Sequence, residues 1–287
     1  MAVYTTIDDP SLFFDTLTYT GNMSTDRDIT GLDFQPDFVW VKNRATTNYH
    51  NIKDSVRGTS VVIFANNSDA EISDSDRVTA FLSNGFTVSN SADTNGSGNS
   101  IVAWCWKAGG SASSNSDGDI TSSVSANTTA GFSILTYTGN GTDGDTVGTG
   151  LNQAAEFVIV KPRDQAENWN VQTQGKRLNL NLNLGSFTSY LMTFNTSTVA
   201  LTDLTYQNGN TYSMLMYAFH SVQGFSKMGS YKGNGNADGT FVYTGFKPAF
   251  ILIKNTSSTS DWNMRDSKRG DWTPGNTRTW ILLANTN

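Results

Sequence analysis

The chain of 287 residues contains few of the groups on which enzymes commonly depend. It has one cysteine and two histidines. A single cysteine cannot form an internal disulfide, so Cys105 is predicted to be a small apolar residue of a buried strand. No Cys/His set has zinc-site spacing, and no glycine loop has the Gly-Lys-Ser/Thr ending of a phosphate cradle. No run approaches 18 apolar residues. We therefore expect no cofactor and no membrane insertion.

Charged residues are also scarce. They make up 15% of the chain, against about 25% in an average soluble domain. Ser, Thr, Asn and Gly take their place, which is typical of extracellular and particle-surface β proteins. The net charge of -6 and the absence of a long basic run disfavour nucleic acid as a partner. The N-terminus lacks the pattern of a signal peptide, so we expect assembly in a host cytoplasm and release within a particle.

What the chain does contain is a threefold internal repeat. A Tyr-Thr/Lys-Gly-Asn motif occurs at 19–22, 137–140 and 231–234, and an apolar strand ending in lysine follows it at 38–42, 157–161 and 250–254. A third marker, Asp-Ser-x-Arg-Gly, occurs at 54–58 and 266–270 and is absent from the second copy. The copies start about 100 residues apart, too far for solenoid units of about 20 to 50. They fit small domains in tandem, each with its own core.

The strand signals predict an all-β chain of tandem small β-sandwiches. Short β-branched and aromatic runs alternate with turn residues about every ten positions, and at most a short helix is expected at 69–82. We divide the chain into repeat 1 (1–107), a flexible Gly/Ser linker (108–118), repeat 2 (119–224) and a partial repeat 3 (225–287). Repeat 3 lacks counterparts of the last strands of the other repeats. Truncation is the favoured interpretation, and strands supplied by a neighbouring chain are the alternative.

Two acidic patterns offer candidate sites. The Asp-Ser-x-Arg-Gly marker is the best catalytic candidate, but no base lies beside it and repeat 2 lacks it, which favours a strand end and turn. The acidic glycine turns at 117–119, 143–145 and 234–239 offer oxygen ligands for Ca²⁺ but no calcium-loop spacing, so ordinary turns are favoured. We predict no catalytic and no metal residues.

Three ring-bearing residues follow the lysine-ended strands in equivalent places: His50, Trp169 and Trp262. Neighbouring amides would suit sugar hydroxyls, with each ring as an apolar platform. These three residues are therefore our candidate ligand or partner contacts. Packing of the rings over a sandwich face or at a subunit contact is the favoured alternative.

Three stretches, at 31–43, 101–110 and 243–254, carry a resemblance that covers essentially the whole chain. They resemble repeat-containing virion structural proteins of tailed bacteriophages, especially of marine and aquatic bacteria. Such proteins are capsid-associated or tail-fibre-like, and their last repeat runs on beyond the point where this chain stops. The strand order of repeat 1 is also similar to concanavalin-like jelly-roll sandwiches, which is a likeness of fold only.

These observations lead to a prediction of function. We expect a non-enzymatic structural protein of a virion, as a capsid decoration, head fibre or tail fibre component, that contacts other virion proteins and copies of itself. The alternative is a receptor-binding, lectin-like module that recognises host surface glycans. A glycan-degrading enzyme is disfavoured, because no pair of acidic residues recurs at matching positions of the repeats.

Overall fold

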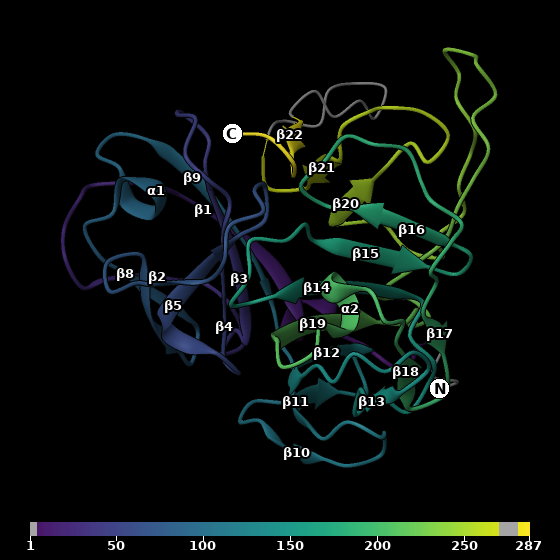
Figure 1. The fold of residues 1–287 in the computed structure, drawn as a ribbon. Coiled ribbons are helices and arrows are strands. Elements are labelled where there is room, and N and C mark those ends of the chain that lie inside the picture. The colour runs from purple at the N-terminus through teal and green to yellow at the C-terminus, as the bar shows by residue number, and fades with distance from the viewer. Residues whose placement is uncertain (1–4, 270–280) are drawn as a thin grey trace.

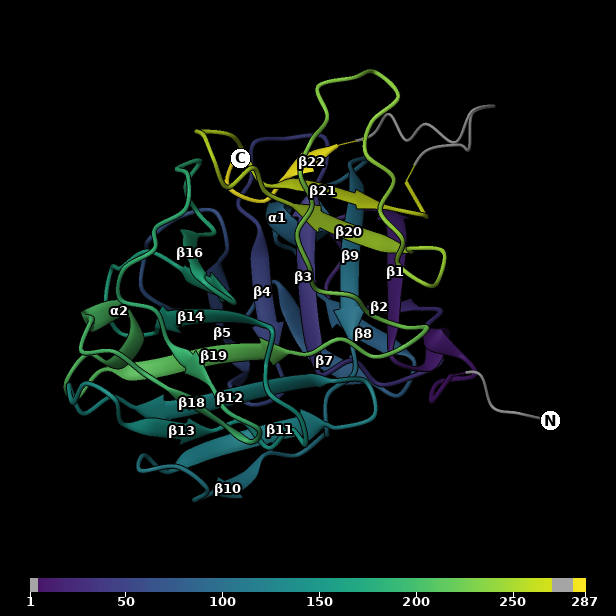
Figure 2. The same cartoon turned by 90° about the vertical axis from the view of Figure 1, so that its right-hand side faces the viewer.

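The structure is a computed structural model that describes residues 5–269 and 281–287 (Figures 1 and 2). Strands make up 39% and helices 4% of the described residues, which confirms the predicted all-β fold. The α-helices in these residues are single turns, α1 (Ala92–Asn95) and α2 (Thr205–Asn208). No helix in the described residues is long and apolar enough to cross a membrane.

Repeat 1 is a sandwich of two antiparallel sheets. After a 3-10 helix at Pro10–Leu12, its strands are β1 (Phe14–Thr20), β2 (Arg27–Thr30), β3 (Phe38–Asn43), β4 (Asn51–Asp54), β5 (Gly58–Phe64), β6 (Ile72–Ser73), β7 (Val78–Leu82), β8 (Gly85–Val88) and β9 (Ser100–Trp106). The large sheet has the order β1-β9-β3-β4-β5-β6 and the small sheet β2-β8-β7. Residues 69–82 hold β6 and β7 rather than a helix, because Val78–Leu82 pairs with β8.

Repeat 2 has the same plan. Its strands are β10 (Ser113–Asn115), β11 (Ser122–Asn127), β12 (Phe132–Thr138), β13 (Thr146–Gly148), β14 (Phe157–Pro162), β15 (Asn170–Thr173), β16 (Lys176–Asn179), β17 (Thr193–Phe194), β18 (Thr198–Ala200) and β19 (Ser213–Phe219). The sheets have the orders β10-β11-β12-β19-β14-β15-β16 and β13-β18-β17. In repeat 1 the last strand, β9, lies between β1 and the lysine-ended β3, and in repeat 2 the last strand, β19, lies between β12 and the lysine-ended β14. We call β9 and β19 the closing strands.

Repeat 3 forms one small sheet in the described residues. Its strands are β20 (Phe250–Ile253), β21 (Asn263–Asp266) and β22 (Leu282–Leu283), in that order. The lysine-ended strands are equivalent in all three repeats, because the cross-strand pairs Phe38–Asp54, Phe157–Thr173 and Phe250–Asp266 occupy matching positions. Repeat 3 shows neither a closing strand nor a second sheet in these residues.

The hydrophobic side chains form three cores rather than one for each repeat. The first core lies between the two sheets of repeat 1 and the second between the two sheets of repeat 2. The third, the shared core, includes side chains from the opposite faces of the large sheets and from the sheet of repeat 3. Its members include Trp40 and Trp104 of repeat 1, Tyr217 of repeat 2 and Met264 of repeat 3. The repeats are therefore not independent tandem domains.

The segment 108–118 is not a flexible linker. Ala108 is buried in the shared core, and its N–H donates to Oδ2 of Asp37 at 2.8 Å. A Cβ atom on Gly109 would lie 2.5 Å from the carbonyl oxygen of Ala126, so glycine is required here for a close approach of two backbones. Residues 113–115 form β10, which pairs with β11. The glycine and serine content predicts a mobile segment, but packing against the shared core and pairing with β11 hold it in place.

Candidate functional site

The candidate contacts His50, Trp169 and Trp262 lie in the same place in each repeat. Each follows the lysine-ended strand, and each backbone N–H donates to an asparagine Oδ1 that comes just after β5, β16 or β22. The acceptors are Asn66 at 2.8 Å, Asn181 at 3.1 Å and Asn285 at 2.8 Å. The three loops are therefore built alike, although the side chain is imidazole in one and indole in the other two.

The rings of these residues point into the junction between the repeats. Nε1 of Trp169 donates to the carbonyl oxygen of Phe64 in repeat 1 at 2.7 Å. Nε1 of Trp262 donates to the carbonyl oxygen of Asn179 in repeat 2 at 2.8 Å. Phe64 and Asn179 end the equivalent strands β5 and β16. Repeat 2 is thus bonded to repeat 1, and repeat 3 to repeat 2, by the same contact.

His50 extends this pattern to the contact between repeats 1 and 3. Its pKa is held well below the ordinary value by burial, and then by the positive charges of Lys42 and Arg269, while backbone groups of Leu283 and Thr286 oppose that shift. Leu283 corresponds to Phe64 and Asn179. The three loops therefore follow one another in a cycle, in which two indoles donate to a backbone carbonyl of another repeat, whereas Nε2 of His50 has no hydrogen-bond partner in the described residues.

The imidazole of His50 is neutral in this setting. Nε1 of Trp40 donates to Nδ1 of His50 at 3.0 Å, so Nδ1 is the acceptor nitrogen and the ring proton lies on Nε2. Trp169 and His50 are completely buried, and Trp262 is 3% exposed. No face of the three rings is open to a sugar. The structure corrects their interpretation as glycan contacts and places them at the packing contact between repeats.

The first Asp-Ser-x-Arg-Gly marker forms a turn, as the favoured interpretation predicted. Oδ1 of Asp54 accepts the backbone N–H groups of Val56 at 3.1 Å and Arg57 at 2.9 Å. Oδ2 accepts Nε of Arg57 at 2.6 Å and the hydroxyl of Tyr217 at 2.7 Å. Tyr217 belongs to the closing strand of repeat 2, and burial raises its pKa. The turn is also a hydrogen-bonded contact between two repeats.

The second marker repeats this arrangement between repeats 3 and 1. Oδ1 of Asp266 accepts the N–H groups of Lys268 at 3.1 Å and Arg269 at 2.9 Å. Oδ2 pairs with Nε of Arg269 and accepts Nε1 of Trp104 at 3.0 Å. Trp104 holds the position in β9 that Tyr217 holds in β19. The last residue of the marker, Gly270, lies outside the described residues.

Repeat 2 lacks the Asp-Ser-x-Arg-Gly marker, and the structure shows a difference at the same place. Thr173 stands in the place of Asp54 and Asp266. By the same cycle, the ring that would reach Thr173 belongs to a closing strand of repeat 3, and the described residues contain none. In this chain the aspartate occurs at the two places where it accepts a hydrogen bond from a Tyr or Trp side chain of a neighbouring repeat. Its presence follows the packing of the repeats rather than a shared reaction.

A second ionic contact joins repeats 1 and 2. Nη1 of Arg57 lies 2.7 Å from Oε2 of Glu71, and Nη2 of Arg163 lies 2.7 Å from Oε1 of the same carboxylate. The side chains of Arg57 and Asp54 are completely buried. Each of these buried charges has an opposite partner and further hydrogen bonds, which is the condition under which burial is tolerated. The arrangement offers a fixed scaffold rather than an exposed acid, base or nucleophile.

The lysine that ends each apolar strand fastens the following loop. Nζ of Lys161 donates to the carbonyl oxygens of Pro162 at 2.8 Å and Gln165 at 2.9 Å. Lys42 donates to loop carbonyls of Thr46 and Asn48. Burial lowers the pKa of both Lys42 and Lys161 to about 8. The ammonium group of each lysine thus holds the loop that follows its strand and carries His50 or Trp169.

Raising the pH from 8 to 10 is expected to increase the free energy of unfolding by at least about 1 kcal/mol. Lys42 and Lys161 have folded-state pKa values of about 8 and ordinary values of 10.5. Between these values the unfolded chain binds protons that the folded chain does not, so stability rises with pH. Urea unfolding at pH 8, 9 and 10 measures the slope. Lys161→Met should reduce this slope, and an unchanged slope would contradict the assignment.

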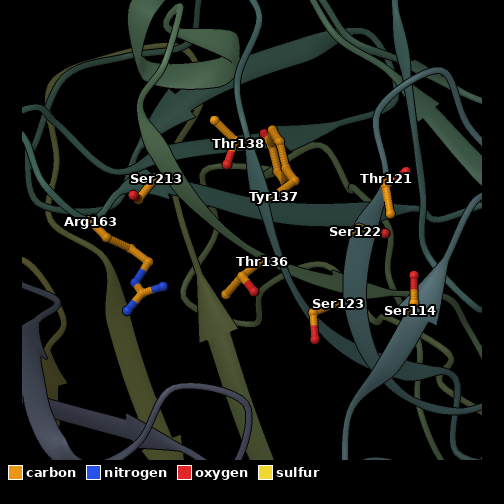
Figure 3. A pocket seen from close by; sticks show the side chains of 9 residues that line it. All are labelled: Ser114, Thr121, Ser122, Ser123, Thr136, Tyr137, Thr138, Arg163 and Ser213. Carbon is orange, nitrogen blue, oxygen red and sulfur yellow. The ribbon is translucent and has the colours of Figure 1, made fainter.

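The open surface has a shallow hollow on repeat 2 (Figure 3). Its volume is about 370 Å³, and its lining is mostly hydroxyl groups of β10, β11, β12 and β19. The lining residues are Ser114, Thr121, Ser122, Ser123, Thr136, Tyr137, Thr138, Arg163 and Ser213. Arg163 is already paired with Glu71. The hollow can donate and accept hydrogen bonds, but it presents no activated nucleophile.

The acidic glycine turns are held by their own hydrogen bonds. Oδ2 of Asp119 accepts both the N–H (3.0 Å) and the hydroxyl (2.7 Å) of Thr146, and Oδ2 of Asp145 accepts Nδ2 of Asn140 at 2.6 Å. Over residues 5–269 and 281–287, no cluster of His, Cys, Asp or Glu is placed to hold a metal ion. Cys105 is completely buried in the core of repeat 1, as predicted, and burial raises its pKa.

The fold and the junction define a three-repeat β protein whose repeats are bonded around a shared core. The chain belongs to the family described as Domain of unknown function (DUF7483), whose profile matches residues 9–287. That match includes all three repeats. No curated protein and no solved structure is significantly similar to the chain.

Sequence reasoning missed the closing-strand rings as junction residues. Neither Trp104 nor Tyr217 is among the candidate contact residues that the sequence indicates. The sequence did contain a signal for these contacts. Both positions carry a large ring with a hydrogen-bond donor, and both markers begin with an aspartate that can accept from it. The pairing between them crosses repeats, over 162 residues for Trp104 and Asp266, so no local pattern identifies it.

Proposed function

We propose that this chain is a non-enzymatic structural protein of a tailed-phage virion, as a capsid decoration, head fibre or tail fibre component. The single observation that carries the proposal is the use made of the repeated residues. The ring positions and the Asp–Arg turns bond one repeat to the next and are buried in doing so. Catalytic groups would instead converge on an open pocket.

The rest of the molecule suits repetition on a particle. A shared core makes the three repeats one body, so a load on one sandwich is passed to the others through packed side chains. The surface is poor in charge, with 15% charged residues in the whole chain, and close neighbours therefore meet little repulsion. Contacts with other virion proteins and with copies of the same chain can each be weak, because many such contacts on one particle together give strong binding. The sequence resemblance points to the same setting.

An averaged electron-microscopy map of purified particles tests this function. We expect density for a three-lobed β module, with local threefold character, at regular positions on the capsid or tail. Particles assembled without this protein are the control and should lack the density. The proposal fails if the protein is absent from purified particles. It also fails if the purified chain degrades host polysaccharide and Asp54→Asn abolishes that turnover.

Glycan recognition is the second candidate, and the hydroxyl-lined hollow on repeat 2 is the observation that favours it. Sugar hydroxyls could bond to side chains such as Thr136 and Ser213, which line the hollow. The contacts to sugar would then be made by hydroxyl groups and not by the three buried rings. Screening the protein against host surface glycans, with Thr136→Tyr to fill the hollow, separates the two functions. Binding that the variant abolishes would favour the lectin-like role.

A further inference from the structure

Repeat 1 contains a buried pair of opposite charges between its two sheets. Nζ of Lys53 contacts Oδ2 of Asp74 and also the carbonyl oxygen of Thr59. The side chain of Lys53 is 1% exposed, and that of Asp74 is completely buried. Lys53 lies in β4 opposite Val39, so its side chain is on the sheet face that carries the core of repeat 1. Asp74 lies in the connection from β6 of the large sheet to β7 of the small sheet.

Repeat 2 makes the equivalent contact with a neutral amide. Gln172 in β15 holds the place that Lys53 holds in β4. Its Nε2 donates to the carbonyl oxygen of Met192 at 2.6 Å, and its Oε1 accepts the N–H of Met192 at 2.7 Å. Met192 comes directly before β17 of the small sheet. A carboxamide therefore joins the two sheets there, and the sandwich does not require two buried charges at this place.

The surroundings of the charged pair favour a reaction between its members. Burial lowers the pKa of Lys53, against the hydrogen bond with Asp74, and two neighbouring arginine charges act in the same direction as burial. A desolvated amine beside cationic groups is a nucleophile. Nη1 of Arg77 contacts Oδ1 of Asp74, the oxygen that Lys53 does not contact. A guanidinium there stabilises the negative charge that develops when an amine attacks the carboxyl carbon.

A second carboxyl group lies beside the pair and can carry a proton. The pKa of Asp76 is raised by burial and then by its hydrogen bond with Asp74 and the charge of that group. The side chain of Asp76 is 50% exposed. It thus connects the buried pair with solvent, as a proton carrier must.

We propose that Lys53 and Asp74 condense to an isopeptide bond, an amide crosslink between the two side chains. The bond between Nζ and Cγ forms, and the bond between Cγ and Oδ2 breaks. Starting from ammonium and carboxylate, Nζ keeps one proton as the amide N–H and gives up two, and Oδ2 leaves with both as water. Asp76 passes a proton from Nζ to Oδ2. The reaction requires no oxidant, metal or second substrate.

Proximity and burial both favour the amide. Fixing an amine against a carboxyl group corresponds to an effective molarity of about 10⁵ to 10⁸ M, which is far above the concentration of water in the solvent. Condensation also removes two charges from a buried place, where each is costly to desolvate. Arg77 does not lose its only partner, because its Nε lies 3.0 Å from Oδ2 of Asp93.

The crosslink would fasten the strand to which repeat 2 is bonded. It closes a loop from 53 to 74 that contains β5 and β6. Phe64 at the end of β5 accepts the indole N–H of Trp169. The bond would keep this strand tied to both sheets of repeat 1 even under load. The inference goes beyond the proposed structural function and does not rest on it.

Intact mass spectrometry of the whole protein, denatured after purification, tests the crosslink. We expect the mass calculated from the sequence less one water molecule, and a proteolytic digest should contain one branched peptide that joins Lys53 to Asp74. Lys53→Arg keeps the positive charge but cannot form the amide, and it should have the full mass. Lys161→Met is the matched control, since Lys161 is a buried lysine that donates to backbone carbonyls, and it should still lose water.

Three results would count against this chemistry. The full sequence mass for the natural protein would overturn the proposal. A loss of water that persists in Lys53→Arg would also overturn it, because that water comes from another site, such as a cyclised Asp-Gly turn. Asp76→Asn should form the bond at least about 100-fold more slowly while its circular dichroism stays that of the natural protein. Complete crosslinking of this variant at purification would overturn the role of Asp76.

Discussion

Replacing Trp40 by isoleucine is expected to lower the free energy of unfolding by about 3 kcal/mol, and adding His50→Trp is expected to restore most of that loss. Trp40 is 3% exposed in the shared core and bonds to His50. Repeat 2 has Ile159 and Trp169 in these two places. The large ring and the smaller side chain have therefore exchanged positions between repeats, and the exchange keeps the filled volume similar.

Each single change disturbs that balance in a different way. Trp40→Ile leaves a cavity and removes the donor to Nδ1 of His50. His50→Trp alone adds volume beside an intact Trp40 and should cost about 1–3 kcal/mol. In the double variant the new indole can bond to the carbonyl of Leu283, as Trp169 bonds to that of Phe64. A double-mutant cycle measured by urea unfolding at pH 7 should therefore give a favourable coupling energy of about 2 kcal/mol or more. Additive losses would contradict this account.

The same variant has a second readout in acid. The pKa of His50 is held well below 6.5, first by burial and then by the charges of Lys42 and Arg269. Below pH 6.5 the unfolded chain binds a proton that the folded chain does not, so the free energy of unfolding falls as the pH falls. Between pH 6.5 and 5 this loss should be smaller in the double variant than in the natural chain. If stability falls equally with pH in both proteins, a group other than His50 is responsible for the acid sensitivity.

Asp54→Ala is expected to be the most damaging single change at the junction, with a loss of about 3–5 kcal/mol. The side chains of Asp54 and Arg57 are both completely buried. Removing the carboxylate leaves the guanidinium of Arg57 with only Glu71 as an anionic partner, and it leaves the hydroxyl of Tyr217 without its acceptor. Urea unfolding compared with the natural chain measures the effect.

Two further variants control this experiment. Ser55→Ala changes the adjacent residue, whose buried hydroxyl has no partner in the described residues, and should alter stability by no more than about 0.5 kcal/mol. Tyr217→Phe removes only the bond between repeats and should cost about 1–3 kcal/mol, because it leaves a buried charged acceptor with fewer donors. If Ser55→Ala is as damaging as Asp54→Ala, the turn rather than its ionic contacts determines stability.

Several elements of the fold could be predicted from the sequence. The lysine-ended strands, the turn at Asp54 and the buried Cys105 follow from alternation, turn chemistry and composition. These features depend on neighbours within a few residues. The prediction of a flexible linker is wrong, because glycine at position 109 is required by the close approach of Ala126, which lies in β11.

The sequence by itself determined that this protein is all-β and that it contains three related units. Periodicity could also show that strands such as Phe38–Asn43 are apolar on both faces. Only the tertiary structure decided what covers the second face. It is the shared core, to which the large sheets of repeats 1 and 2 and the sheet of repeat 3 all contribute side chains. The physical reason is that burial is non-directional, so an apolar face specifies that it will be covered but not by which surface.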